Sequence, residues 1–360
     1  MLLKRLIRVY LILGKTFNVW FAPIFTVILV LILRLVVGLG RMVDHLFFWS
    51  IRKPLENPII IVGNPRSGTT FLHRFLIKQG IGTGSELWQM IYPSITVQKC
   101  VKPILPLLEI ISPARHHSTK AHKTSLTSIE TDDVSLLFRY LDGFFFYGFF
   151  LTFDKEDLFR WVDPDIRDTS VRDFLWFESI WKRNLVSNKG SRYIGKLFSL
   201  SSNLPSFQER FSNAKIIYMV RDPISVIPSG LSLVTGVLDK RFNFWSLDAK
   251  IRDRFIERLY NALVELLNRF HSDWVNNKIN KKNVYIVHFD TMMNDFEILM
   301  DGLLDFINHE KNDSLLKVIK KTANNQRQYE SGHKYNLDKF GISKDQIRND
   351  CKNIYETFLS

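Results

Sequence analysis

Residues 59–76 read IIIVGNPRSGTTFLHRFL, a run of β-branched residues that leads into a glycine-rich loop and then into a helical pattern of apolar residues. The two glycines are spaced as in the G-x-x-x-x-G frame of a phosphate-binding P-loop. That motif continues with Lys and then Ser or Thr, whereas Thr69 and Thr70 stand here. The loop contains an arginine, Arg66, and lacks the lysine, so the sequence raises the question of which phosphate it binds.

The order of strand, tight loop and helix creates a binding place for an anion. We expect the N–H groups of Ser67, Gly68, Thr69 and Thr70 to point at one position, where the helix dipole also favours negative charge. Two other interpretations are open at this point. One is an ATPase or kinase in which Asp290, after a later strand, helps to hold magnesium. The other is a glycine-rich turn without a ligand.

A second strand, loop and helix follow in residues 216–230, IIYMVRDPISVIPSG. Asp222 stands at the expected N-cap of the helix, directly before Pro223. Arg221 at the end of the strand can bind an anion with two nitrogens, and the hydroxyl of Ser229, about two helical turns later, can donate to the same group. This pair carries little weight alone, but it becomes specific beside a P-loop that lacks its lysine.

Strands and helices alternate along the rest of the chain, which predicts an α/β fold with a P-loop-like parallel sheet flanked by helices. Strands are expected at 59–62, 214–220 and 283–289, and helices at 69–79, 248–275, 295–308, 313–326 and 343–358. Residues 85–135 contain several prolines and a histidine-rich patch, so we expect an irregular insertion there.

The N-terminus is expected to be a membrane helix. Residues 19–33, VWFAPIFTVILVLIL, contain no charge, and the apolar sequence resumes after Arg34 to a length that can span a bilayer. We expect a retained anchor over residues 1–50, either a tilted span or a monotopic hairpin, and an α/β domain over residues 51–360. A buried core helix is the alternative. Basic residues flank the stretch on both sides and give no orientation.

The formal charge of 49 − 36 = +13 indicates anionic partners, such as nucleotides or an acidic membrane surface. The sequence has no long Lys/Arg block and no zinc-finger or RNA-recognition signature, so nucleic acid is not an expected partner. Cys100 and Cys351 are the only cysteines and lie far apart, which fits a reducing compartment without a disulfide framework. No ligand spacing suggests a metal site.

The stretches NPRSGTT and VRDPISVIPSG together resemble the sulfotransferases that use 3′-phosphoadenosine 5′-phosphosulfate (PAPS). The similarity spans roughly residues 57–358, and residues 331–347, SGHKYNLDKFGISKDQI, look like the closing segment of the bacterial-type branch. The resemblance implies that PAPS is the donor substrate and that no metal is required. The implied donor-binding residues are, in the first loop, Arg66, Ser67, Gly68, Thr69 and Thr70, at the 3′-phosphate Arg221 and Ser229, and in a covering basic loop Ser331, His333 and Lys334.

The sequence departs from the cytosolic members of this family at two places. They carry a lysine at the position of Arg66, and they carry a Lys-x-His in mid-chain whose histidine is the catalytic base. Here Lys196 matches that lysine, but Phe198 replaces the histidine. Lys196 and Arg66 are therefore candidates for stabilising the transferring group and the leaving phosphate, while a solvated surface lysine is the alternative for Lys196.

The base must then be another residue. Glu130, followed by Asp132 and Asp133, precedes a predicted helix where related bacterial-type sequences have an acidic cluster. His117, with its neighbour His116, is the rival. His73, on the helix after the first loop, is a weaker candidate. The alternative for the acidic cluster is that it only stabilises the start of the helix.

The acceptor is expected to be hydrophobic. Residues 143–153, GFFFYGFFLTF, are predicted to form a buried helix, or else to line an apolar acceptor cleft. With a membrane anchor, this favours a lipid or hydrophobic alcohol as acceptor of the sulfuryl group, and a membrane-displayed glycan is the next alternative. We expect the catalytic domain to face the cytoplasm, where a bacterial-type enzyme meets PAPS. A luminal Golgi enzyme is the other possibility.

Overall fold

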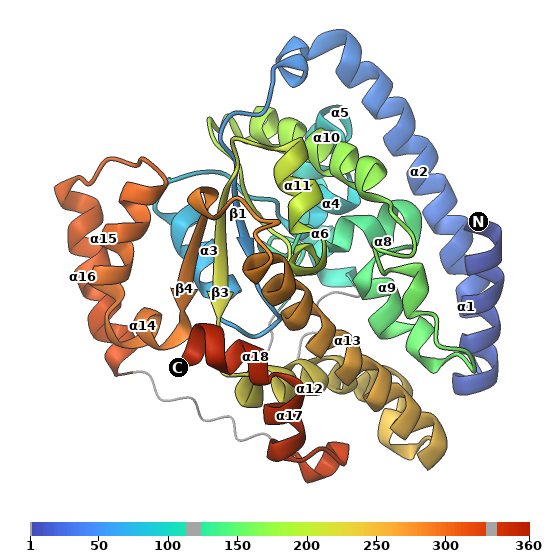
Figure 1. The fold of residues 1–360 in the computed structure, drawn as a ribbon. Coiled ribbons are helices and arrows are strands. Elements are labelled where there is room, and N and C mark those ends of the chain that lie inside the picture. The colour runs from blue at the N-terminus through green and yellow to red at the C-terminus, as the bar shows by residue number, and fades with distance from the viewer. Residues whose placement is uncertain (1, 113–123, 329–336) are drawn as a thin grey trace. The chain divides into compact units, whose positions relative to one another are not determined.

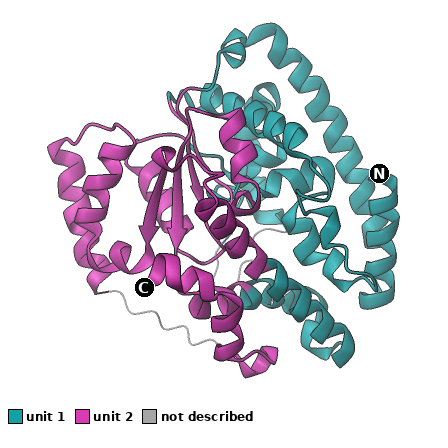
Figure 2. Ribbon diagram, in the orientation of Figure 1, with its two compact units in different colours: residues 1–55, 84–191, 231–262 teal, residues 56–83, 192–230, 263–360 magenta. Residues whose placement is uncertain are grey.

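The computed structural model describes residues 2–112, 124–328 and 337–360. Figure 2 shows that the chain forms two compact units, each built from three segments. Unit 1 comprises Met1–Leu55, Gly84–Ser191 and Leu231–Ala262, and unit 2 comprises Glu56–Thr83, Arg192–Gly230 and Leu263–Ser360. The first 50 residues thus belong to the same unit as later segments, and the expected domain boundary near residue 50 stays a prediction.

Unit 2 contains a sheet of four parallel strands in the order β2-β1-β3-β4, of which β1, β3 and β4 are labelled in Figure 1. The strands are β1 (Ile59–Val62), β2 (Ile194–Lys196), β3 (Lys215–Val220) and β4 (Val284–His288). All four residues of β1 are fully buried, as a central strand covered on both faces requires. The predicted α/β fold with a parallel sheet is therefore confirmed.

Helices cover both faces of this sheet. On one face a buried apolar cluster joins the odd-numbered residues of β1 to α3 (Thr69–Lys78), α14 (Phe289–Asn294), α15 (Phe296–Phe306) and α16 (Asp313–Arg327). On the other face Tyr218 of β3 stacks on Phe270 of α13 (Ala249–Val275). Because β-branched and aromatic side chains fill both sides, the sheet is a rigid platform for the loops at its ends.

The other helices that belong wholly or partly to unit 2 are α11 (Leu204–Arg210), α12 (Pro223–Phe242), α17 (Lys344–Asp350) and α18 (Lys352–Ile354). One continuous helix was expected over 343–358, but the chain leaves helical geometry at Cys351, with φ −112° and ψ 18°. The Cys351 side chain is fully buried there. The interruption points the Cys351 side chain toward the core.

Unit 1 is helical. Besides the parts of α12 and α13 that lie within Leu231–Ala262, its α-helices are α1 (Leu2–Phe17), α2 (Ala22–Phe47), α4 (Leu87–Ile91), α5 (Ile95–Val101), α6 (Leu105–Ile111), α8 (Val134–Tyr140), α9 (Phe144–Phe149) and α10 (Ser170–Asn188). Residues 87–111 thus contain three short helices where the sequence predicts an irregular segment. The aromatic run after Gly143 forms α9, in which Phe146 and Tyr147 are buried, followed by a buried 3-10 turn over Leu151–Phe153. The expected buried helix is therefore confirmed for residues 144–149 only.

Helix α1 is held in unit 1 by buried ion pairs. Arg5 contacts Asp142 at 2.9 Å, and the same carboxylate also contacts Arg167 at 2.5 Å and Arg172 at 2.8 Å. Burial alone would raise the pKa of Asp142, but the hydrogen bond and charge of Arg167, with the other two guanidiniums, lower it below its ordinary value. Asp142 is therefore the charged centre of a network that fixes α1.

Helix α2 has two different sides. Its inner side contains Asp44, which is fully buried and accepts hydrogen bonds from the N–H groups of Ile95 and Thr96, each at 2.9 Å, and from Arg183 Nε at 3.0 Å. Its outer side is apolar and exposed, with Phe25 at 66% and Leu35 at 65%. By length and composition α2 can cross a membrane, yet its C-terminal half is bonded to α5 and α10.

Candidate functional site

The candidate site lies in unit 2 at the carboxyl ends of β1 and β3. These two strands are parallel neighbours, so their following loops meet at one edge of the sheet. The chain goes from β1 to β2 on one side and then to β3 on the other side of β1. In open parallel sheets, ligands bind at such a switch point.

The loop after β1 requires its two glycines. Gly63 has φ +141° and Gly68 has φ +96°, in the region that side chains rarely adopt. A Cβ on Gly63 would lie 2.8 Å from the carbonyl oxygen of Met219, and a Cβ on Gly68 would lie 2.5 Å from Met292 Cε. Arg66 also has a positive φ, of 78°. The backbone of this loop is therefore tightly enclosed by β3 and α14.

Asn64, which sequence reasoning overlooked, holds the loop in place. Its buried side-chain amide donates to the carbonyl of Leu263 at 2.9 Å. The backbone carbonyl of Asn64 accepts from Ser67 Oγ at 2.8 Å and from the Ser67 N–H at 3.2 Å. The Ser67 amide is thus used within the loop. The N–H groups of Thr69 and Thr70, in the first turn of α3, have no intrahelical carbonyl to donate to and remain suited to an anion.

Three of the predicted donor-binding residues are brought together by hydrogen bonds. Arg66 Nε donates to Ser229 Oγ at 3.0 Å, and Arg221 Nη1 donates to the carbonyl of Arg66 at 2.8 Å. The Arg221 guanidinium also lies over the ring of Phe289, 3.8 Å from its centroid. Residues from the two phosphate-type loops therefore form one continuous polar group, and Phe289 orients its arginine.

Lys196 also lies at this edge of the sheet. It is the last residue of β2, it pairs with Ile61 of β1, and only 6% of it is exposed. Its Nζ donates to Thr70 Oγ1 at 3.0 Å, at the start of α3. The structure thus places the lysine beside the first loop, and the alternative of a solvated surface lysine is wrong.

The second loop is connected to the C-terminal segment. Asp222 Oδ1 accepts from the N–H of Ile224 at 2.9 Å, which confirms its predicted role as a helix cap. The same oxygen accepts from the hydroxyl of Tyr355 at 2.5 Å. Burial, together with the nearby Asp222 carboxylate, raises the pKa of Tyr355, so this tyrosine stays protonated and remains a donor. No local signal in the sequence pointed to this contact.

The leading candidate for the base, Glu130, lies in unit 1. It is 6% exposed, its Oε1 accepts from Ser128 Oγ at 3.0 Å, and its backbone N–H donates to the carbonyl of Ser85 at 3.4 Å. Nearby, Asp133 Oδ2 accepts from Thr131 Oγ1 at 2.6 Å. The acidic cluster is thus buried and hydrogen-bonded in unit 1.

A second carboxyl beside this cluster was missed. Glu86 forms an isolated antiparallel bridge with Ile129 and caps α4, with Gln89 completing a capping box. Burial raises the pKa of Glu86 above its ordinary value, although Trp88, which donates to it at 2.5 Å, acts in the opposite direction. The capping-box spacing in the sequence could have identified its structural role.

The histidine candidates differ. His73 is fully buried, and its Nε2 donates to the carbonyl of Ile194 at 2.9 Å, which ties α3 to β2. His117, and the predicted covering residues Ser331, His333 and Lys334, lie outside the described residues. Their assignments stay predictions. Within residues 2–112, 124–328 and 337–360, no group of three or more His, Cys, Asp or Glu side chains is arranged to hold a metal.

Comparisons with known proteins agree with this architecture. A family model described as the sulfotransferase family matches residues 58–313, more than half of the chain. Among solved structures, sulfotransferase STF9 from Mycobacterium avium is similar with a TM-score of 0.69 and 16% identity, over 89% of this chain and 81% of that one. Sulfotransferase STF1 from Mycobacterium tuberculosis is similar with a TM-score of 0.67 and 16% identity, over 97% of this chain and 90% of that one. A search of curated proteins gives no match.

Proposed function

Because the chain belongs to the sulfotransferase family and is a PAPS-dependent transferase, we propose that it sulfates a lipid or other hydrophobic alcohol at a membrane. In this proposed function, the residues around the loops after β1 and β3 bind the donor. The observation that supports the donor site is the bonded group of Arg66, Arg221 and Ser229 at the carboxyl ends of neighbouring strands.

The residues at this edge suit a donor with two phosphate positions. PAPS, when bound, supplies the sulfuryl group and a bisphosphate leaving group. In the proposal, the first turn of α3 and Arg66 bind the 5′ side, while Arg221 and Ser229 bind the 3′-phosphate. Since the Ser229 hydroxyl is already within 3.0 Å of Arg66 Nε, the two positions share a boundary.

Lys196 has the electrostatic role in this proposal. Its ammonium group is largely buried beside Thr70, where a fixed positive charge acts more strongly than in water. A cation held at the place where negative charge develops lowers the barrier without reorganising during the reaction. Glu130 remains the proposed general base, which would take the proton from the acceptor hydroxyl.

Two observations support a hydrophobic acceptor and a membrane location. The outer side of α2 exposes large apolar residues along its length, and α6 exposes Leu107, Ile110 and Ile111, each at 60% or more. We place the catalytic domain in the cytoplasm. Cys100 is exposed and Cys351 is buried, and both are free thiols, as in a reducing compartment.

Donor selectivity tests the proposal first. Adenosine 3′,5′-bisphosphate should raise the melting temperature of the full chain, because a ligand at about 100 times its dissociation constant adds about 2.7 kcal/mol of stability. AMP should act only at much higher concentration. Stabilisation by ATP with magnesium, and none by the bisphosphate, would contradict the proposal and return to the ATPase interpretation.

Arg221→Ala should weaken binding of adenosine 3′,5′-bisphosphate by roughly 30- to 800-fold, or about 2 to 4 kcal/mol, because it removes one side of a desolvated charge pair. Ser229→Ala should cost about 1 kcal/mol. Isothermal titration calorimetry measures both effects.

The control is AMP, which lacks the 3′ group and should bind both variants as it binds the wild type. Arg210→Ala is a matched control, because Arg210 is an exposed arginine of unit 2 that stacks on Phe211 at 5.8 Å. Equal losses for AMP and the bisphosphate would place Arg221 outside the 3′-phosphate site.

A further inference from the structure

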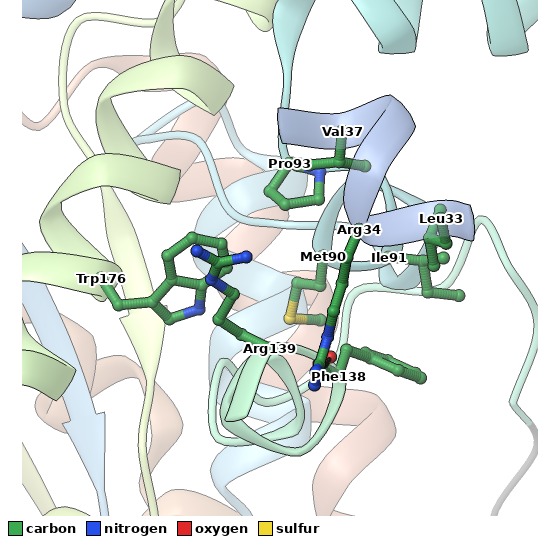
Figure 3. Close-up of a pocket in the computed structure, with 9 residues that line it drawn as sticks. All are labelled: Leu33, Arg34, Val37, Met90, Ile91, Pro93, Phe138, Arg139 and Trp176. Carbon is green, nitrogen blue, oxygen red and sulfur yellow. Dashed lines mark hydrogen bonds between the residues drawn. The ribbon is translucent and has the colours of Figure 1, made fainter. Parts of the chain in front are cut away.

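Unit 1 contains an open hollow that the donor site does not use. It lies against the inner side of α2, and it is shallow and open to solvent. Leu33, Val37 and Met90 form apolar walls, and Arg34, Arg139 and Trp176 complete the lining (Figure 3). The hollow therefore combines an apolar surface with two guanidinium groups.

Among the described residues, the two arginines in this hollow have no acidic partner. Arg34 Nη2 donates to the carbonyl of Phe138 at 3.2 Å, and its buried Nε has no hydrogen-bond partner among those residues. Arg139 is exposed, and its guanidinium stacks near Trp176, 5.1 Å from the ring centroid (Figure 3). Within the described part of the chain, no carboxylate forms an ion pair with either group.

A third guanidinium increases the positive charge. Arg41 does not line the hollow, but it lies 4.7 Å from the centroid of the same Trp176 ring and donates to Ser179 Oγ at 2.7 Å. Arg139 is close enough to Arg34 and to Arg41 for the like charges to repel, and this cost grows where water is excluded. An anion bound between Arg34 and Arg139 would remove this repulsion and give the buried Nε an acceptor.

The surroundings indicate that this anion carries hydrocarbon chains. Ile32, Leu35 and Val36, one or two residues from the hollow along α2, are 55%, 65% and 47% exposed. The exposed apolar side of α2 thus continues from the edge of the hollow. We propose that the hollow binds the phosphate of an anionic membrane phospholipid, with its acyl chains along α2.

This site also determines how α2 meets the membrane. Arg34, Arg41 and Asp44 bind α2 to other segments of unit 1 along one side, so only its outer side is available to lipid. The helix then lies in one leaflet, parallel to the surface, and the enzyme is monotopic. The inference rests on the membrane location proposed above and adds the class of lipid headgroup.

Vesicle sedimentation with the full chain tests both the membrane location and the headgroup site. The wild type should bind phosphatidylcholine vesicles and should bind roughly 25-fold more tightly when phosphatidic acid is included, about fivefold from each of the two arginines. Arg139→Gln should remove about fivefold of that preference, and Arg34→Gln a similar factor, as expected for one basic residue at an anionic surface. Arg139 is exposed, so its replacement leaves the core packing intact.

Each outcome is decisive. Arg210→Gln should leave the preference unchanged, and an equal loss in that variant would mean general surface charge and would overturn the headgroup site. Binding to both vesicle types with no preference would overturn the site but leave the membrane location standing. No binding to either would overturn the membrane location itself.

A thermal-shift assay without vesicles distinguishes binding of a lipid phosphate from binding of inorganic phosphate. Short-chain phosphatidic acid should raise the melting temperature of the wild type more than that of Arg139→Gln, whereas inorganic phosphate should affect the two equally. The difference between the two proteins is the relevant quantity, because phosphate is also expected at the loop after β1. If inorganic phosphate separated the melting temperatures of the two proteins as much as short-chain phosphatidic acid does, the part assigned to the acyl chains would be overturned.

Discussion

Glu130→Gln should lower the turnover number by roughly 10²- to 10⁴-fold, the usual contribution of a general base, while the affinity for adenosine 3′,5′-bisphosphate stays at the wild-type value. Glutamine retains an oxygen that can accept the hydrogen bond from Ser128, but it cannot take a proton. A burial of 94% gives the side chain a fixed position, and the isosteric replacement preserves the packing. Steady-state sulfation kinetics and calorimetry measure the two quantities.

The control for this experiment is Glu109→Gln. Glu109 is another carboxylate of unit 1, and its Oε2 accepts from the N–H of Leu126 at 2.7 Å. Its replacement should leave turnover unchanged. If Glu130→Gln reacts at the wild-type rate and His117→Asn does not, the proton is taken by the histidine. If both variants are fully active, Asp133→Asn is the next test and the assignment of Glu130 is wrong.

Asp44→Asn should reduce the free energy of unfolding by about 3 to 5 kcal/mol, because it leaves a buried arginine without its counter-charge. The side chain of Arg183 is 2% exposed and lies 3.0 Å from Asp44. The asparagine amide would in addition present N–H groups to the donors of Ile95 and Thr96. Urea unfolding of the full chain, followed by tryptophan fluorescence, measures the change.

Asp301→Asn provides the comparison for a surface pair. Asp301 is 66% exposed and lies 2.5 Å from Lys311, so its loss should cost less than about 1 kcal/mol. An Asp44→Asn protein as stable as Asp301→Asn would mean that this carboxylate does not hold α2 against α5 and α10.

The strands and both phosphate-type loops were predictable because their signals are local. A β-branched run, two spaced glycines and an Asp-Pro helix start each act through neighbouring residues in the chain. The pairing of Lys196 with Ile61, which brings the lysine to Thr70, depends instead on which strands become neighbours in the sheet. The sequence therefore indicated the lysine but not its partner.

The helices of residues 87–111 could not be predicted for a related reason. They are short, with Pro106 inside α6 and Pro93 and Pro103 between the helices, and isolated helices of this length are unstable in water. Trp88, Val101 and Leu105 lie in one buried cluster, so packing stabilises these turns. In the same way, the role of Asp44 could not be predicted from its neighbours in the apolar helix, because its partners Ile95, Thr96 and Arg183 come from distant segments.

The two cysteines differ in accessibility, and this difference determines how the protein can be labelled chemically. Burial, with the nearby Asp350 and Asp222 carboxylates, raises the pKa of the Cys351 thiol to about 12, and the residue is fully enclosed. Thiol reagents act on the thiolate, so at neutral pH they should modify Cys100 alone. Cys100 lies on α5, the helix that Asp44 joins to α2. The natural sequence therefore accepts a single fluorophore next to α2 without any engineered cysteine.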